Sequence, residues 1–219
     1  MFTLIFFRKF FKYCLIIWGI SLIPVIIYKW INPPFTMIQN SQSDIRGEKG
    51  RWIDIEEIPK YFQLAAMAGE DQVFFDHWGF DFRAIEKAIE HNATSNKTRG
   101  ASTISQQTAK NVFCWEGRSW LRKGVETYYT CMIELFWSKK RILEVYLNVI
   151  EMGRGAFGVD EAAHYYFHIP AEKLSRQQSI LIISTLPCPR TCGFNSALAR
   201  NRQYLINYAM RRYGLKLKY

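Results

Sequence analysis

The chain has 219 residues, of which 49% are hydrophobic and 22% charged, and 29 Lys and Arg against 19 Asp and Glu give it a formal net charge of +10. An apolar fraction this high excludes a disordered or low-complexity chain, and the length fits one domain with a short appendage. Five Cys are too few for a disulfide scaffold. The positive excess indicates an anionic partner, and nucleic acid, phospholipid headgroups and phosphorylated substrates all satisfy it on charge alone.

An apolar stretch near the N-terminus predicts a membrane-spanning helix. After the basic residues Arg8, Lys9 and Lys12, the chain runs without a charge from Tyr13 to Tyr28. Counted with its aromatic neighbours, this stretch reaches the roughly 20 residues that cross a bilayer. A cleaved signal peptide is the alternative, but the stretch is long for one and no A-x-A-like cleavage site follows. We therefore expect a retained anchor with a cytoplasmic N-terminus, because the basic residues precede the span.

Beyond the anchor, a polar stretch over 36–54 predicts a linker, and the signals after it are helical. Pro59 suits the first turn of a helix that ends near Glu70. Strand-like alternation is nearly absent, so we expect one mainly α domain over residues 55–219. The further predicted helices are SQQTAKNV behind a capping box of Thr103 and Gln106, WLRKGVETYYTCMIELFW behind Ser119, KKRILEVYLNVIEM behind Ser138, VDEAAHYYF from Val159, and LSRQQSILIISTL.

The segment GEDQVFFDHWGFD places a carboxylate where its pKa should rise. Glu70 ends a predicted helix, beside Asp71 and among aromatic residues. The negative end of the helix dipole, the neighbouring carboxylate and a dry environment all disfavour ionised Glu70. A carboxyl group tuned in this way suits a general base near neutral pH. The alternative is a solvated acidic turn in which His77 only hydrogen-bonds backbone.

Polar side chains gather at a second helix start, in RGASTISQQTAKNVF. Hydroxyls and backbone N–H groups at a helix N-terminus can hold an anion or a sugar hydroxyl, and paired glutamines suit carbohydrate or peptide amides. An ordinary capping box on a surface helix is the alternative, but the density of polar groups favours substrate binding. The candidate residues are Ser102, Thr103, Gln106, Gln107, Lys110 and Asn111.

A third segment, RSWLRKGVETYYT, surrounds another carboxylate with cations. Arg122 and Lys123 precede Glu126 by four and three residues on one predicted helix, and Arg118 lies just before that helix. Neighbouring cations favour the ionised form of Glu126, whereas the surroundings of Glu70 favour its neutral form. Two carboxyl groups whose pKa values are shifted in opposite directions indicate two roles. Taken alone, the segment is better explained as a surface ion pair worth roughly a few tenths of a kcal/mol.

Three other features give weaker indications of function. Residues 153–158 match G-x-G-x-x-G, but they follow a predicted helix rather than a strand, so we expect a tight turn between two helices and no dinucleotide site. His164 and His168 lack a third ligand, which argues against zinc. Cys188 and Cys192 flank a turn, and the sequence does not decide between a disulfide and free thiols.

The basic C-terminal tail has two candidate partners. It holds no acidic residue after Glu172, and in isolation it could bind nucleic acid. An anchored domain outside the cytoplasm rarely meets nucleic acid, so we expect the tail to contact a membrane surface or an anionic wall polymer instead.

Five segments follow one another in a fixed order. Together they resemble the monofunctional biosynthetic peptidoglycan transglycosylases of glycosyltransferase family 51, and the predicted anchor with no second domain matches that monofunctional form. Cys188 departs from the family's LPNP-type stretch, where Asn is usual, and Gly124 interrupts a predicted helix at about 1 kcal/mol relative to Ala. The segments are EDQVFFDHWGFD at 70–81, GASTISQQTAKN at 100–111, RKGVE at 122–126, KKRILEVYLN at 139–148 and GAFGVDEAAHYYF at 155–167.

The resemblance implies a lysozyme-like helical fold and polymerisation of lipid II, a disaccharide-pentapeptide on undecaprenyl diphosphate. Glu70 falls on the family's base, which takes the proton of the acceptor N-acetylglucosamine 4-hydroxyl while the growing chain is transferred with inversion and undecaprenyl diphosphate departs. Lys110 and Arg118 match diphosphate-contacting residues. Glu126 matches the second essential Glu, which either orients cations or holds a divalent cation, Mg or Mn, on the diphosphate.

The expected organisation is a cytoplasmic stub and anchor over 1–35, a linker over 36–54 and a glycosyltransferase domain over 55–219. The resemblance implies a single-pass protein of the inner membrane with a periplasmic catalytic domain. Its expected partners are lipid II, the growing glycan chain, membrane lipids and other cell-wall synthesis and division proteins, and not nucleic acid. The competing hypotheses are a lytic transglycosylase or lysozyme-like enzyme and a non-catalytic wall-binding module.

Overall fold

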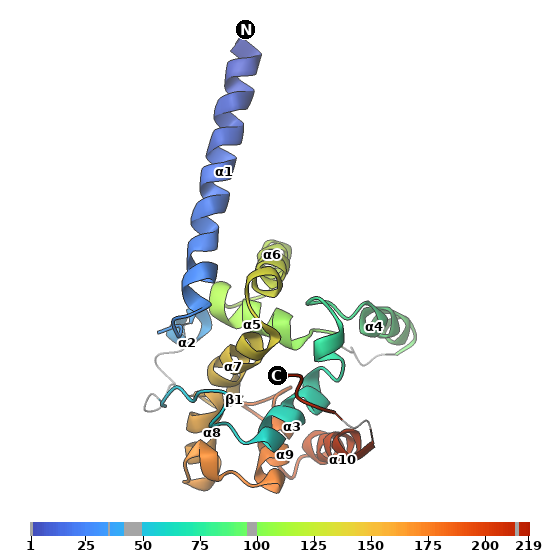
Figure 1. Cartoon of the computed structure of the whole chain (residues 1–219). Helices are drawn as coiled ribbons and strands as arrows, with labels where there is room; N and C mark the ends of the chain where they lie inside the picture. The colour runs from blue at the N-terminus through green and yellow to red at the C-terminus, as the bar shows by residue number, and fades with distance from the viewer. Residues whose placement is uncertain (1, 35, 42–49, 96–99, 213–214) are drawn as a thin grey trace.

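The structure is a computed structural model that describes residues 2–34, 36–41, 50–95, 100–212 and 215–219. One long helix stands out from a globular part built of helices (Figure 1). The small antiparallel hairpin of β1 and β2 lies between two of these helices. The architecture is mainly α, as the sequence predicts.

The helices alternate with short turns along the chain. They are α1 (Phe2–Tyr28), α2 (Met37–Ser41), α3 (Lys60–Glu70), α4 (Phe82–Thr94), α5 (Ile104–Phe113), α6 (Trp120–Phe136), α7 (Lys139–Val149), α8 (Gly158–Phe167), α9 (Arg176–Ser184) and α10 (Ala197–Arg212). The short 3-10 helices are η2 (Phe74–Asp76) and η3 (Ala171–Lys173), and the strands are β1 (Glu151–Gly153) and β2 (Ala156–Phe157).

Two groups of helices share one apolar core. In the first, α5 packs on α6 and α7, and in the second, α3 packs on α9 and α10. The largest fully buried side chains include Tyr146 of α7 and Phe62 of α3, so the core runs through both groups. Glu70 lies at the end of α3 where the two groups meet, because α5 approaches it from one side and α10 from the other.

Side-chain caps begin the helices where the sequence predicts them. At α5 the Thr103 hydroxyl accepts from the Gln106 amide at 3.2 Å, and the Gln106 side chain accepts from the Thr103 amide at 3.1 Å. Ser119 and Ser138 accept in the same way from the third residues of α6 and α7. Each cap satisfies a backbone N–H that the helix leaves without a partner, and the predicted capping box is confirmed.

The helix α7 is shorter than predicted. It ends at Val149, and the following residues form β1 rather than another helical turn. Gly158 explains the change, because its φ of 80° suits a residue without a side chain and a Cβ there would lie 2.5 Å from the Asn148 carbonyl oxygen. Its amide donates to Ile150 O at 2.9 Å, which closes the hairpin against the end of α7. The G-x-G-x-x-G segment is therefore a hairpin between two helices.

Part of the stretch predicted as a linker is packed against the globular part. Thr36 and Gln39 are buried at the start of α2. Further along, the Ile53 amide donates to Asn148 Oδ1 at 2.9 Å, and Asn148 Nδ2 donates back to Ile53 O at 2.9 Å. Polar composition misleads here because these polar groups satisfy one another inside the structure. Residues 42–49 of the same stretch lie outside the described part.

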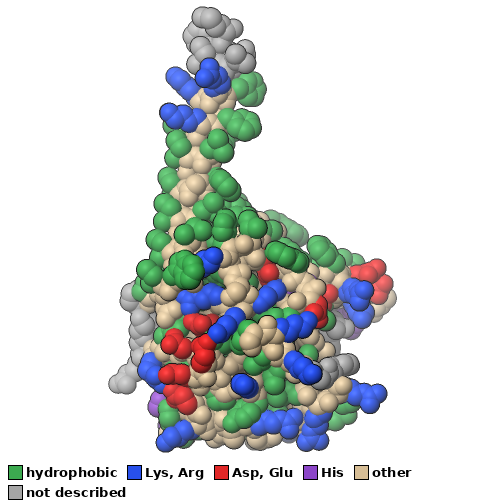
Figure 2. Space-filling view, in the orientation of Figure 1, with side chains coloured by type: hydrophobic (Ala, Val, Ile, Leu, Met, Phe, Trp, Pro, Cys, Tyr) green, Lys and Arg blue, Asp and Glu red, His purple; other side chains and the backbone are tan. Residues whose placement is uncertain are grey.

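The end of α1 is fixed to the globular part, whereas residues 7–20 of the helix are exposed. Trp137 Nε1 donates to Val25 O at 2.7 Å, and the Arg141 guanidinium donates to Tyr28 O at 3.0 and 3.1 Å, which satisfies carbonyls at the helix end. The segment Phe7–Tyr28 has a mean hydropathy of 2.1 and only 6% of its most apolar window is buried, so it is long and apolar enough to cross a membrane. Hydrophobic side chains cover α1 along its length, with Lys and Arg near its free end (Figure 2).

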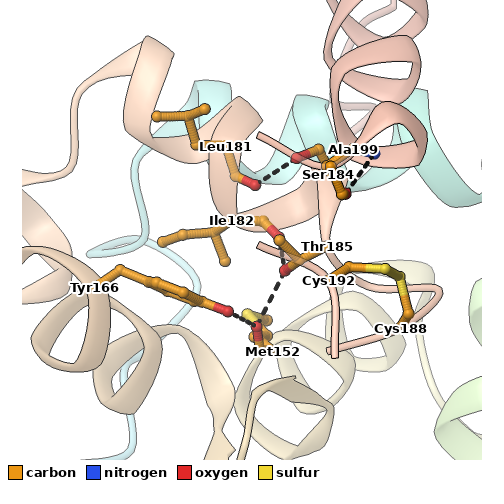
Figure 3. The surroundings of a disulfide bond; sticks show 10 residues. Met152, Tyr166, Leu181, Ile182, Ser184, Thr185, Cys188, Cys192 and Ala199 are labelled. Carbon is orange, nitrogen blue, oxygen red and sulfur yellow. Dashed lines mark hydrogen bonds between the residues drawn. A yellow bond between two sulfur atoms is a disulfide. The ribbon is translucent and has the colours of Figure 1, made fainter. Parts of the chain in front are cut away.

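A disulfide closes the turn that leads from α9 to α10. Cys188 and Cys192 are bonded, with their Cα atoms 5.3 Å apart, which answers the question that the sequence leaves open. Figure 3 shows that Thr185, just after α9, donates to the Met152 carbonyl at 3.2 Å, and Tyr166 donates to the same oxygen at 3.0 Å. The end of α9 is thus tied to β1 and α8, and the chain starts towards α10 from a fixed point.

Candidate active site

Glu70 meets side chains from two other helices. Its side chain is 14% exposed. Gln107 Nε2 of α5 donates to Glu70 Oε2 at 2.8 Å, and Arg202 Nη2 of α10 donates to Glu70 Oε1 at 2.5 Å. Tyr146 donates from the core to Gln107 Oε1 at 3.4 Å. The carboxylate is therefore positioned by an amide on one side and a guanidinium on the other.

Burial raises the pKa of Glu70 above its ordinary value, while Arg202 and Gln107 oppose the rise. The predicted direction is confirmed, and removal from water is its main cause. An ionised carboxylate offers about four acceptor positions, and the two contacts occupy one on each oxygen. Lone pairs remain free to take a proton from a substrate hydroxyl, so the group can serve as a general base.

Arg202 was not predicted from the sequence, because the basic tail was expected to contact membrane or wall. It lies on the buried stripe of α10, three residues after Ala199 and four before Ile206, both of which are buried. A charged residue on an apolar helix stripe is the signal that could have identified it. Gly69 lets α10 approach α3 closely, since a Cβ there would lie 3.3 Å from Arg202 Nη2, and the Gly69 carbonyl accepts from the same nitrogen at 3.1 Å.

Asp71 and His77 join α3 to α5. Asp71 is buried, and its Oδ2 accepts from the Ile104 amide at 3.1 Å, in the first turn of α5. His77 Nε2 lies 3.0 Å from both carboxylate oxygens of Asp71. A solvated acidic turn is therefore excluded for Glu70 and Asp71, and His77 pairs with a side chain rather than with backbone alone. These contacts fix the distance between Glu70 and the helix that carries Gln107.

The polar residues around the start of α5 divide into two groups. Thr103 and Gln106 are buried and form the cap, and Thr103 also donates to Gly79 O at 2.6 Å. Asn111 donates to the Gln107 carbonyl at 2.8 Å. Gln107 reaches Glu70, whereas Ser102 and Lys110 are exposed. The capping interpretation therefore accounts for two of the six candidates.

Three cations surround the buried carboxylate of Glu126, which is only 3% exposed. Arg122 Nη1 donates to Glu126 Oε2 at 2.9 Å, and Lys123 Nζ pairs with the other oxygen. Lys110 of α5 lies beside them; the residue reaches solvent, but partial desolvation of its amine, together with Arg122, lowers the pKa of Lys110. The surface ion pair considered from the sequence is wrong, because Glu126 is buried. We call Lys110, Arg122, Lys123 and Glu126 the cation cluster; its positive excess favours an anion.

Arg118 stands apart from these contacts. It is exposed, just before the Ser119 cap of α6 and one turn before Arg122. An exposed guanidinium at this place can extend the positive surface of the cation cluster towards solvent.

The donor set of the cation cluster does not fit a divalent cation. Both oxygens of Glu126 already pair with cations. Across the described residues, no three His, Cys, Asp or Glu side chains gather as a metal site would require. An oxygen-ligand site for Mg²⁺ needs carboxylates that are not already paired with cations, so the described residues of this cluster do not fit one.

Most of the chain, including the helices that form this site, matches a known protein family. The model of a family described as transglycosylase matches residues 36–211. The chain belongs to the transglycosylase family. The matched range begins inside the predicted linker, includes α2, and extends through α10, so the Arg202 helix is part of the matched domain. The helical architecture is the lysozyme-like one expected of this family.

Curated relatives agree with the family. The chain is similar to the biosynthetic peptidoglycan transglycosylase of Pseudomonas aeruginosa, at 45% identity over 84% of this chain and 82% of the relative. It is 43% identical to the protein of the same name from Stutzerimonas stutzeri, over 91% of this chain and 87% of the relative. A third protein of that name, from Mannheimia succiniciproducens, is 52% identical over 75% of this chain and 68% of the relative.

Proposed function

We propose that the chain polymerises lipid II into the glycan strands of peptidoglycan, with Glu70 as the general base. Family membership and the names of the relatives support a peptidoglycan glycosyltransferase and favour synthesis over lytic cleavage. The observation that carries the assignment of the base is the buried Glu70 carboxylate, held by Gln107 and Arg202 with acceptor positions left free. Its raised pKa suits proton transfer near neutral pH.

The reaction needs one proton acceptor and one anion-stabilising site. Glu70 takes the proton of the 4-hydroxyl of the acceptor N-acetylglucosamine. The freed oxygen bonds to the anomeric carbon of N-acetylmuramic acid at the end of the growing chain, with inversion, as the bond from that carbon to the diphosphate oxygen breaks. Undecaprenyl diphosphate leaves with the electron pair of that bond, so cations near it stabilise the transition state.

The cation cluster is our candidate for the leaving-group site. Lys110, Arg122 and Lys123 supply positive charge, and Arg118 extends it towards solvent. In this assignment Glu126 orients Arg122 and Lys123, because each pairs with one of its oxygens. A diphosphate arriving at the cluster would raise the lowered pKa of Lys110 and keep that amine protonated.

The remaining candidates divide between contact and positioning. Ser102, Gln107 and Asn111 are assigned to the sugar and peptide portions of the substrate: Gln107 donates to Glu70, Asn111 follows it by one turn of α5, and Ser102 is exposed just before that helix. Thr103 and Gln106 contribute through the cap that fixes α5. Gln107 is assigned both roles, because it also donates to Glu70 and so positions that carboxylate.

We place the catalytic domain outside the cytoplasmic membrane, with α1 as a single-pass anchor and the N-terminus in the cytoplasm. Basic residues before the span favour this orientation, and the Cys188–Cys192 disulfide fits an oxidising compartment. The proposed organisation is an anchor over 1–35, a connecting segment over 36–54 and the glycosyltransferase domain over 55–219. Membrane lipids and other cell-wall synthesis and division proteins are proposed partners, because the product must be cross-linked by enzymes acting on the same strands.

The decisive experiment compares Glu70→Gln with wild type on labelled lipid II in lipid bilayers. Replacing the base is expected to abolish long glycan while the helical circular dichroism signal stays the same. The matched control is Glu86→Gln, which neutralises an exposed carboxylate on α4 and should leave polymerisation intact. Polymerisation by Glu70→Gln would remove Glu70 from the mechanism.

The same protein separates synthesis from cleavage. Incubated with purified sacculi, wild type is expected to release no soluble muropeptides while it extends lipid II in a parallel reaction. Release of muropeptides without polymer growth would instead support a lytic transglycosylase.

A further inference from the structure

An apolar pocket lies where the membrane helix joins the globular part. Its volume is about 280 Å³. For comparison, an apolar cavity of roughly 150 Å³ can hold a benzene molecule. The side chains around it come from four helices that are distant in the sequence. They are Pro24 and Tyr28 of α1, Thr36, Met37 and Asn40 in and before α2, Val112 and Phe113 of α5, and Tyr129 of α6.

Aromatic packing and hydrogen bonds hold the walls of this junction pocket. Phe113 stacks on Tyr129 with ring centroids 4.4 Å apart, and Tyr28 packs against Phe113 at 6.2 Å. The α1 wall is fixed because Arg141 and Trp137 bind the carbonyls at the helix end. The pocket is therefore formed before any ligand arrives, which lowers the entropic cost of binding.

The polar groups of Thr36 at the pocket are already satisfied within the protein. The Thr36 hydroxyl accepts from the Gln39 amide at 3.1 Å, and Gln39 Oε1 accepts from the Thr36 amide at 3.3 Å. The Thr36 carbonyl accepts from the Asn40 amide at 3.0 Å. What the pocket offers a ligand is thus mainly aromatic and aliphatic surface, which suits a hydrocarbon.

Helix α5 connects this pocket to the catalytic residues. Gln107 contacts Glu70, Lys110 belongs to the cation cluster, and Phe113 lines the pocket. These residues are three apart, so each is displaced by about 60° around the helix from the one before, and the series runs obliquely across the surface of α5 over about 9 Å at 1.5 Å per residue. Helix α6 repeats the relation, since Glu126 of the cluster and Tyr129 of the pocket are also three apart.

We propose that the junction pocket binds the polyprenyl chain of the substrate, taking the isoprene units next to the diphosphate. The inference rests on the proposed function. Along α5 the order of base contact, cation and apolar pocket equals the order of sugar, diphosphate and prenyl chain in lipid II. The α1 wall continues into the uncovered apolar helix, so the chain leaves the pocket directly into the bilayer.

Pocket-filling variants of the full chain in phospholipid nanodiscs test this assignment. Met37 is 52% exposed and Asn40 is also exposed, so a larger side chain at either place can turn into the pocket without disturbing the core. Met37→Trp and Asn40→Trp are each expected to weaken binding of undecaprenyl diphosphate by about tenfold, because two or so methylene groups lose their burial. Binding of inorganic diphosphate should not change, which also reports that the cation cluster is intact.

The matched control is Ile31→Trp, which adds the same side chain at an exposed position of the same junction outside the pocket lining. It should bind both probes like wild type. Undecaprenyl diphosphate binding that is unchanged in both pocket variants would overturn the proposal and leave a phospholipid acyl chain as the occupant. Equal weakening of both probes would also overturn it.

Photo-crosslinking provides a measurement that needs no variant. An undecaprenyl diphosphate with a diazirine on its second isoprene unit should label wild type at Met37, Phe113 or Tyr129. Labelling only at other places would contradict the pocket assignment. This outcome is distinguishable from failure of the proposed function. If wild type does not polymerise lipid II, the proposed function is wrong. If the pocket variants polymerise lipid II with an unchanged KM, only the pocket assignment is wrong.

Discussion

At Glu70, two opposing effects set the protonation equilibrium. Burial favours the neutral acid and raises the pKa, whereas the Arg202 guanidinium 2.5 Å away favours the carboxylate and lowers it. The net pKa is raised, so protonation removes the proposed base at a higher pH than for an ordinary glutamate. Activity should therefore fall as the pH drops through this raised value. The ionised form is also the one that burial penalises, so this group contributes stability that is lost as pH rises through the raised pKa.

Arg202→Gln is expected to move the acidic limb of the kcat/KM profile upward by about one pH unit or more, because the cation that favours the ionised base is gone. The measurement is lipid II turnover as a function of pH. Arg202→Lys should return the limb towards its wild-type place, and Arg200→Gln, which neutralises an exposed cation on the same helix, should leave it unmoved. If Arg202→Gln lowers kcat/KM equally at every pH and leaves the acidic limb at the same pH, Arg202 has only a structural role.

Local sequence singled out Glu70 and the residues around Glu126 as candidates, but not Arg202. The cation cluster contains a pair four residues apart and a pair three apart, and such spacing is visible on a helix. Arg202 and Glu70 are separated by 132 residues, and only the packing of α10 on α3 brings them together. A contact of this kind depends on the tertiary structure. The spacing of residues in one sequence therefore does not predict it.

Among the helices, capping residues explain which starts were predicted correctly and why one start was missed. The helices behind Thr103, Ser119 and Ser138 begin as predicted. Asp81 caps α4 in the same way, but no helix was predicted after it. Helix α10 was missed because its basic composition was given more weight than its apolar spacing. The hairpin after α7 could not be anticipated from strand alternation, since its strands have only three and two residues.

The disulfide between α9 and α10 is expected to matter for stability and not for turnover. Its loop is short, so chain-entropy loss predicts that replacing both Cys188 and Cys192 with Ser lowers the free energy of unfolding by about 2 kcal/mol. Helix α10 stays docked through buried residues such as Ile206, which keeps Arg202 at Glu70. Thermal unfolding in detergent and lipid II turnover measure the two effects.

Cys131→Ser is the matched control, because this cysteine is free and exposed, and neither quantity should change. A strong loss of turnover in the double variant would mean that the docking of α10 depends on the turn and not on its apolar face.

Across the whole molecule, the membrane helix does more than hold the chain at the bilayer. Its end supplies one wall of the junction pocket, and α6 and α7 bind its last carbonyls. Ser21 adds a hydrogen bond to the Tyr128 hydroxyl at 2.6 Å, half-way into the apolar span. Anchor and catalytic domain therefore meet at fixed contacts. On the proposed assignment of the junction pocket, the anchor is part of the path by which a lipid-borne substrate reaches the cation cluster.

A chain beginning at Gln42 lacks α1 and α2 and should turn over lipid II in bilayers at least about tenfold more slowly than the full chain, because both the anchor and two pocket walls are lost. A chimera tells these losses apart. If residues 13–20 are replaced by an unrelated apolar sequence, the chain keeps its anchor, the basic residues before the span and all the pocket residues from Pro24 onward. This chimera is expected to work at the full-length rate. A slow chimera would place the contribution in the replaced segment, and a truncated chain as fast as wild type would remove the anchor from catalysis.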